Sequence, residues 1–148
     1  MPIKQISVFI ENRPGSLAAV ANVLREHTID LRALSLADVQ DYGILRIIVD
    51  DVYAASNVLR NASYVFKITP MLAVMLKDQA GSLADALEVL GNHAINIEYL
   101  YAFGGREQGR AYVAFRLDDA EMDKAAAILQ QAGFPAISAD GENGKIVW

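Results

Sequence analysis

A short polar turn occurs twice in the sequence, and both copies carry residues suited to holding a small anion. The first copy is Asn12-Arg13-Pro14-Gly15-Ser16-Leu17, and the second, 66 residues later, is Asp78-Gln79-Ala80-Gly81-Ser82-Leu83. Each turn follows an alternating apolar stretch and opens a helical pattern, where its glycine permits an unusual backbone conformation. The first N–H groups of a helix lack partners and lie at the positive end of its dipole. The turn can therefore receive a carboxylate; a capped strand-to-helix connection with nothing bound is the alternative.

These turns belong to a longer internal repeat. Residues 12–31 and 78–97 align without gaps and share 8 of 20 residues. A repeat that spans more than one element indicates a duplicated domain. We therefore predict two domains, at residues 1–69 and 70–148.

The hydrophobic pattern predicts the same order of elements in each copy. In the first copy we expect strands near 5–10, 31–37, 44–49 and 64–68, and helices near 17–27 and 52–62. In the second we expect strands near 71–77, 97–103, 110–117 and 134–139, and helices near 82–92 and 120–131. Thr69-Pro70 is expected to be a tight joint, and the loop 104–109 to be mobile. The order β-α-β-β-α-β predicts an α+β fold, with two ferredoxin-like domains whose antiparallel sheets carry both helices on one face.

Alternation along the strands predicts which face meets the helices. The large residues expected on that face are Ile6, Val8, Ile10, Leu34, Leu36, Leu45, Ile47, Leu72, Val74, Leu76, Tyr99, Tyr101, Val113 and Phe115. The small or weakly polar residues expected on the other face are Ser7, Ala33, Ser35, Ala37, Ala73, Met75, Leu100, Ala102 and Ala114. A sheet face open to water is usually more charged, so we expect another sheet or chain to cover this one. A homodimer or a higher symmetric oligomer follows as a prediction.

Composition excludes several classes of function. The net charge is −5 and the isoelectric point about 4.9, which argues against a nucleic-acid binder. The chain has no cysteine, so it has no disulfide, thiol nucleophile or thiolate metal site. No apolar run is long enough for a membrane span and the start does not resemble a signal peptide, so we expect a cytoplasmic protein without a membrane partner.

No set of residues predicts catalysis. His27 and His93 end the first helix of each copy without further ligands at metal-binding spacing, so we expect no metal. Ser16 and Ser82 lack a base and an orienting partner, as a nucleophile would need. The loop from Gly104 to Arg110 has the outer spacing of a phosphate loop, but it lacks the Lys-Ser/Thr end and precedes a strand. We therefore expect no enzyme and no cofactor.

The repeated turn and the predicted fold resemble the ACT domain, a regulatory module that binds amino acids. Residues 12–17 are close to the family pattern Asn/Asp-Arg-Pro-Gly-x-Leu, and Ile29-Asp30-Leu31 and Ile95-Asn96-Ile97 match its entry to the second strand. The resemblance covers nearly the whole chain as two tandem ACT domains. It implies a ligand site where a turn faces a neighbouring domain. The implied ligand-binding residues are Asn12, Arg13, Pro14, Gly15, Ser16, Leu17, Asp30, Asp78, Gln79, Ala80, Gly81, Ser82, Leu83 and Asn96.

The two turns are expected to differ. A ligand's ammonium group would donate hydrogen bonds to Asn12 and Asp30 in the first copy, or to Asp78 and Asn96 in the second. Pro14 restricts the first turn and Arg13 adds a cation to it, whereas the second copy lacks both. If each site forms within one copy, we expect the first to bind more tightly.

The resemblance implies an allosteric regulatory protein that senses a free amino acid. The alternative is a structural or regulatory subunit that binds a metabolic enzyme and has no ligand of its own. Tandem ACT domains also resemble regulatory parts of aspartate kinase and of acetolactate synthase.

Overall fold

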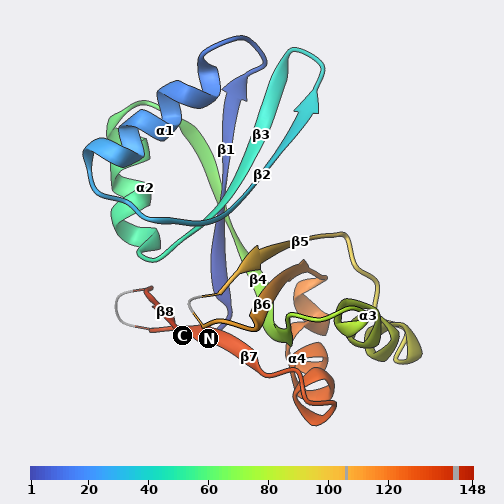
Figure 1. Cartoon of the computed structure of the whole chain (residues 1–148). Coiled ribbons are helices and arrows are strands. Elements are labelled where there is room, and N and C mark those ends of the chain that lie inside the picture. Colours follow the sequence, from blue (N-terminus) through green and yellow to red (C-terminus); the bar gives the residue numbers. More distant parts are fainter. Residues whose placement is uncertain (106, 142–143) are drawn as a thin grey trace. The chain divides into compact units, whose positions relative to one another are not determined.

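The computed structural model describes residues 1–105, 107–141 and 144–148 and contains two compact units. The N-terminal unit consists of Lys4–Thr69 with Ala139–Ile146, and the C-terminal unit of Met1–Ile3, Pro70–Ser138 and Val147–Trp148. Figure 1 shows the elements along the chain. The first six are β1 (Ile3–Glu11), α1 (Ser16–Glu26), β2 (Leu31–Val39), β3 (Tyr42–Val49), α2 (Val52–Asn61) and β4 (Val65–Lys77), which crosses from one unit into the other. The others are α3 (Ser82–Asn92), β5 (Tyr99–Gly104), β6 (Arg110–Arg116), the 3₁₀ turn η1 (Asp119–Glu121), α4 (Met122–Gln131), β7 (Ala136–Ala139) and β8 (Ile146–Val147).

Both units have the β-α-β-β-α-β order of elements that the sequence pattern predicts. Hydrogen-bonded neighbours run β2-β3-β1-β4 in the N-terminal unit and β5-β6-β4-β7 in the C-terminal unit. In each unit the two helices lie on one face of the sheet (Figure 1). Thr69 and Pro70 do not separate two strands, because β4 continues through them from Val65 to Lys77. The predicted mobility of the 104–109 loop is not addressed, since Arg106 lies outside the described residues.

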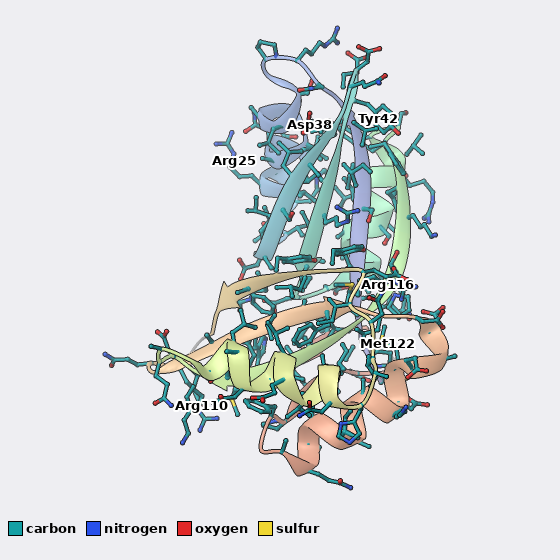
Figure 2. All side chains as sticks on the ribbon, turned by 90° about the vertical axis from the view of Figure 1, so that its right-hand side faces the viewer. Arg25, Asp38, Tyr42, Arg110, Arg116 and Met122 are labelled. Atoms are coloured by element: carbon teal, nitrogen blue, oxygen red, sulfur yellow. The ribbon has the colours of Figure 1, made fainter. Side chains whose placement is uncertain are left out.

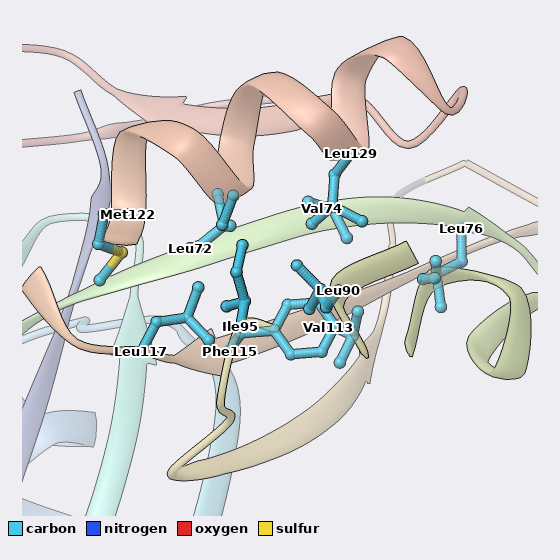
Figure 3. Close-up of a cluster of buried hydrophobic side chains, with 12 residues drawn as sticks. Leu72, Val74, Leu76, Leu90, Ile95, Val113, Phe115, Leu117, Met122 and Leu129 are labelled. Carbon is cyan, nitrogen blue, oxygen red and sulfur yellow. The ribbon is translucent and has the colours of Figure 1, made fainter. Parts of the chain in front are cut away.

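Each unit has its own apolar core between its helices and its sheet. In the N-terminal unit, Ile6, Val8, Leu45 and Ile47 pack with Leu24 and Leu59 of the helices. Figure 3 shows the corresponding core of the C-terminal unit, with Phe115 at its centre. Its other members include Leu72, Val74, Leu76, Leu90, Ile95, Val113, Leu117, Met122 and Leu129. The spacing of apolar residues therefore predicts most of both cores.

Two parts of the predicted face assignment are wrong. Tyr99 and Tyr101 do not face the helices, because Tyr101 pairs with Ala114 whereas Leu100 pairs with the core residue Phe115. Leu100, and Ala102 with it, therefore lie on the helix side, contrary to the prediction. A shift of one residue along a strand moves every side chain to the other face.

Leu34 and Leu36 lie on the predicted face but are not in the core. They pair with Ile47 and Leu45, yet their exposed fractions are 57% and 49%. Strand β2 pairs only with β3 among the described residues and forms the edge of its sheet. The helices cover the central strands and leave these two leucines exposed.

The face away from the helices is buried in many places. Gln5, Ser7, Ala33 and Ile48 of the N-terminal unit have exposed fractions of 9% or less. Ala73 and Ala114 of the C-terminal unit are fully buried on the corresponding face. Ser35, Ala37 and Met75, which were predicted for the same face, are only partly buried. That another sheet or chain covers this face stays a prediction.

The four α-helices of the described residues end in the same way, with one residue in the left-handed conformation. These residues are Thr28, Ser63, Ala94 and Gly133, with φ angles of 57°, 64°, 56° and 92°. The next residue then donates its amide to a carbonyl five positions earlier, as Ile29 does to Leu24 and Phe134 to Leu129. Glycine is the usual residue here, so the sequence indicates only the end at Gly133.

Near the C-terminus, Trp148 packs edge-on against Tyr112, with 5.3 Å between the ring centroids. Tyr112 in turn stacks on Phe103 at 5.5 Å. The terminal tryptophan therefore packs on strand β6 of the C-terminal unit.

Candidate functional site

The two repeated turns have nearly identical backbones. Gly15 has φ 86° and ψ −15°, and Gly81 has φ 89° and ψ −16°, both in the left-handed region. The amide of Ser16 donates to the carbonyl of Arg13 at 3.3 Å, and that of Ser82 to Gln79 at 3.3 Å. The repeat in sequence is therefore a repeat in backbone geometry, and glycine is the residue that adopts this conformation with least strain.

Both turns lead into helices whose first amides are not capped by a side chain. Gly15 and Gly81 are the N-cap residues of α1 and α3, and neither position has a side-chain cap hydrogen bond. Each helix is 11 residues long, so its dipole is developed at this end. The backbone at each turn therefore offers N–H donors and a partial positive charge to an anion.

A cavity lies beside the first turn. Its volume is about 490 Å³. The end of β1, the turn, the start of α1 and the residue before β4 all contribute to it. Its lining residues are Phe9, Ile10, Glu11, Arg13, Pro14, Gly15, Ser16, Ala19 and Tyr64.

A larger cavity lies beside the second turn, with a volume of about 660 Å³. It is formed by the equivalent elements of the C-terminal unit and by the loops before β6 and before β7. Its lining residues are Met75, Leu76, Lys77, Gln79, Ser82, Asp85, Gln108, Gly109, Arg110, Ala132, Gly133, Phe134 and Pro135.

The two cavities occupy equivalent places in the two copies. An offset of 66 residues relates Phe9 to Met75, Glu11 to Lys77 and Ala19 to Asp85. Tyr64 and Phe134 correspond as well, since each directly follows the left-handed residue that ends its helix. The chain therefore has two versions of one concave site, with different side chains.

In the first cavity the charged groups neutralise each other. The Nε of Arg13 donates to Oε2 of Glu11 at 2.6 Å. Both side chains are exposed, so the pair contributes little to stability, but it places an anion directly beside the cation. A ligand carboxylate that approaches Arg13 therefore also meets the charge of Glu11.

In the second cavity the charges are arranged differently. Lys77 and Arg110 line it as cations, and Asp85 lines it as an anion in the first turn of α3. Arg110 also donates to Glu107, with 2.8 Å between Nε and Oε2, but this pair lies at the surface. Figure 2 shows Arg110 extending from the end of the C-terminal unit at which α3 begins. This cavity therefore presents charges of both signs to a ligand.

The structure brings only part of the predicted site residues together. Arg13, Pro14, Gly15 and Ser16 line the 490 Å³ cavity, and Gln79 and Ser82 line the 660 Å³ cavity. Asn12 and Leu17 line a smaller cavity of about 80 Å³ on the β2–β3 side of the first turn. The amide Nδ2 of Asn12 is engaged there, donating to the Gln40 carbonyl at 2.9 Å. None of these cavities is lined by Asp30, Asp78, Ala80, Gly81, Leu83 or Asn96.

Asp30 lies at the other end of the helix from its own turn. Helix α1 separates the two, and 11 residues correspond to roughly 16 Å. Asp30 instead contacts Arg32, whose Nε donates to Asp50 at 3.0 Å. The hydrogen bond with Asp50 raises the pKa of Arg32, although burial opposes the shift. Within the N-terminal unit Asp30 therefore does not meet a ligand at the first turn, and Asn96 has the equivalent place after α3.

Sequence reasoning missed several lining residues. Lys77 and Asp85 flank the second turn, and comparing them with Glu11 and Ala19 at the same offset would have drawn attention to them. Arg110 and Phe134 come from distant loops, and only the folded structure brings them to the cavity.

The two histidines have structural partners. The Nδ1 of His27 donates to the Val23 carbonyl at 3.0 Å, and that of His93 to Val89 at 2.8 Å. Within the part of the chain that the structure describes, no cluster of His, Asp or Glu has a geometry suited to a metal ion. Among the described helices, none is long and apolar enough to cross a membrane.

Comparison with known proteins identifies the duplicated unit. A family model described as an ACT domain pair matches residues 1–140. No curated protein matches the chain. Among solved structures, a protein from Bacteroides thetaiotaomicron is 34% identical with a TM-score of 0.83, and the match covers 92% of each chain.

Two more distant structures share the fold. The ligand-free regulatory subunit of aspartate kinase from Thermus thermophilus is 17% identical with a TM-score of 0.66, covering 89% of this chain and 93% of that chain. The regulatory subunit of aspartate kinase from Thermus flavus is 17% identical with a TM-score of 0.55, covering 90% and 94%. At this identity the likeness concerns the fold alone. The predicted fold class, two ferredoxin-like ACT domains in tandem, is confirmed.

Proposed function

This chain belongs to the family of ACT domain pairs, and on that premise we propose that it is a regulatory protein that binds a free amino acid. The observation that carries the proposal is the pair of equivalent cavities, each beside a helix start without a side-chain cap. An α-carboxylate is the part of an amino acid that such a helix start can receive. The predicted turn residues remain the proposed ligand-binding residues, except that Asp30 and Asn96 would need a neighbouring domain to reach a ligand.

A thermal-shift series with the 20 standard amino acids tests the proposal. A ligand that binds only the folded state stabilises it by about 2.7 kcal/mol at a concentration 100 times its Kd. We expect a selective rise in Tm with one amino acid or a chemically related group. A well-folded protein that responds to none of them at millimolar concentration contradicts ligand sensing.

A second candidate function is that of a subunit that binds an enzyme of amino-acid metabolism. It is favoured by the exposed Leu34 and Leu36 on the edge strand β2. The regulatory subunits of aspartate kinase, which share this fold, are examples of such an arrangement in other proteins. An absence of ligand response, together with co-purification of one metabolic enzyme from the native host, would support this function instead.

We also propose that the chain forms a homodimer or a higher symmetric oligomer. The same exposed leucines support this, since single small units rarely leave large apolar side chains on an open strand edge. Sedimentation at micromolar concentration tests it. A monomer whose stability does not fall on dilution would contradict the oligomer.

A further inference from the structure

Ser82 offers a hydroxyl group to the second cavity. It is the first residue of α3 and lines the cavity, but only 6% of its surface is exposed. No hydrogen-bond partner for its hydroxyl occurs among the described residues. The hydroxyl oxygen is not fully enclosed, so it has no unmet need for a protein partner and is free to donate to a ligand oxygen in the cavity. Ser82 and the amides of the α3 start together offer donors to one carboxylate.

Asp85 provides an acceptor one turn further along the same helix. It lines the cavity, and no cation among the described residues pairs with its carboxylate. A carboxylate in the first turn also favours the start of the helix, so its presence does not by itself require a ligand. Ser82 and Asp85 nevertheless lie in the same cavity wall as a donor and an acceptor. This pairing matches an amino acid, in which one carbon separates the carboxylate from the ammonium group.

Lys77 and Arg110 supply more positive charge than one carboxylate needs. Lys77 has no anionic partner among the described residues, whereas Arg110 is paired at the surface with Glu107, which is not a lining residue. Lys77 therefore distinguishes this cavity from the first one, where Glu11 has the equivalent position. The three charged side chains of the lining give a net charge of +1. An amino acid with a second carboxylate has a net charge of −1 at neutral pH and complements it.

We propose that the second cavity binds an acidic amino acid, glutamate or aspartate. Ser82 and the start of α3 hold one carboxylate, Asp85 accepts from the ammonium, and Lys77 with Arg110 holds the other carboxylate. This inference rests on the proposed amino-acid-binding function and adds the ligand class and the preferred cavity. The first cavity lacks this set, because Glu11 replaces Lys77 and Ala19 replaces Asp85.

Isothermal titration of the full chain with matched ligands tests the charge requirement. Glutamate and glutamine differ by one charge at nearly equal size, as do aspartate and asparagine. We expect glutamate or aspartate to bind, and its amide to bind at least tenfold more weakly, since a hydrogen bond to a charged group contributes about 1.5–3 kcal/mol. Equal affinity for the acid and its amide would overturn the ligand class.

Two substitutions test the cavity, each with a matched control. Lys77→Gln and Asp85→Asn change exposed side chains, so both variants should fold. Each should weaken binding of the acidic ligand at least tenfold. Lys124→Gln and Asp123→Asn make the same changes at the start of α4, away from the cavity, and should leave the affinity unchanged. Equal losses in variants and controls would overturn the assignment of the cavity.

The outcomes also separate this inference from the proposed function. If a neutral or basic amino acid binds and both acidic ones do not, the inference fails while the amino-acid-binding function stands. If none of the 20 amino acids binds to the folded protein, both fail.

Discussion

Glu11 and Lys77 occupy the same place in the two copies of the domain, yet they carry opposite charges. Each ends the strand before a repeated turn, and each lines the cavity beside that turn. Glu11 pairs with Arg13 at 2.6 Å, whereas no partner of Lys77 occurs among the described residues. The sequence-based expectation that the first turn binds more tightly rested on the restriction of that turn by Pro14 and on the cation of Arg13. The pairing of Arg13 with Glu11 weakens the second ground, and the charges beside the second turn lead us to favour the second cavity.

The left-handed glycines of the two turns should be sensitive to substitution. Gly15→Val and Gly81→Val place a branched side chain at φ near +86° and +89°. No atom outside the turn lies within 4 Å of the added Cβ, so the expected cost comes from the backbone and is about 1–2 kcal/mol in each case. Urea unfolding measures it.

The same variants report on ligand binding, provided that they remain folded. Gly81→Val should weaken binding of the acidic ligand more than Gly15→Val does, because the second cavity is the proposed site. Gly15→Asn and Gly81→Asn are the controls for stability, since asparagine tolerates the left-handed region better than valine does. A valine variant as stable as its asparagine control would contradict the strain argument.

The helix ends provide a second prediction for stability. Ala94 has φ 56° at the end of α3, where Gly133 has the corresponding place after α4. Ala94→Gly should raise the free energy of unfolding by about 0.5–1 kcal/mol, because glycine removes the steric cost but adds chain entropy to the unfolded state. Gly133→Ala should lower it by a similar amount. Thermal unfolding of both variants tests these two predictions. Stability changes of the same sign in the two variants would contradict them.

The sequence predicts the repeated parts of the structure well, because they depend on local rules. Each turn is recognised by an alternating strand pattern, then a glycine, and then a helical pattern. Both turns fold as expected. Three of the four helix ends were harder to predict from the sequence. Thr28, Ser63 and Ala94 adopt the left-handed conformation there, for which glycine is the usual signal.

Long-range features were harder to predict. Side-chain size suggested that Tyr101 faces the helices, but the pairing of Leu100 with Phe115 decides the face of the whole strand. Likewise, alternation cannot reveal that Leu34 lies beyond the reach of the helices. The cavity beside the second turn also needs Arg110 from a distant loop, and spacing along the chain does not indicate such a neighbour.

Asp50 should contribute more to stability than Asp30, although both contact Arg32. The Arg32 side chain is only 19% exposed and donates to Asp50 at 3.0 Å, whereas Asp30 lies at 3.5 Å and is 60% exposed. Asp50→Ala should therefore lower the free energy of unfolding by about 1–3 kcal/mol, because it leaves a mostly buried guanidinium without the acceptor of this hydrogen bond. Asp30→Ala should cost less than about 1 kcal/mol. Chemical denaturation of both variants tests this order, which equal losses would contradict.

Moving the charges of the second cavity into the first should create a second site. The double variant Glu11→Lys with Ala19→Asp reproduces Lys77 and Asp85 at the equivalent positions of the N-terminal unit. The first substitution also breaks the pair that engages Arg13. The second places a carboxylate at an exposed position near the start of α1, where the helix dipole favours it.

Calorimetry on this double variant measures the number of binding sites. The natural chain should bind one acidic amino acid per chain, and the double variant should bind two, because backbone donors at the first turn match those at the second. Glu11→Gln with Ala19→Asn is the control, since it changes the same positions without supplying the new charges, and it should still bind one. If the double variant folds and binds no more ligand than this control, Lys77 and Asp85 do not determine which cavity binds.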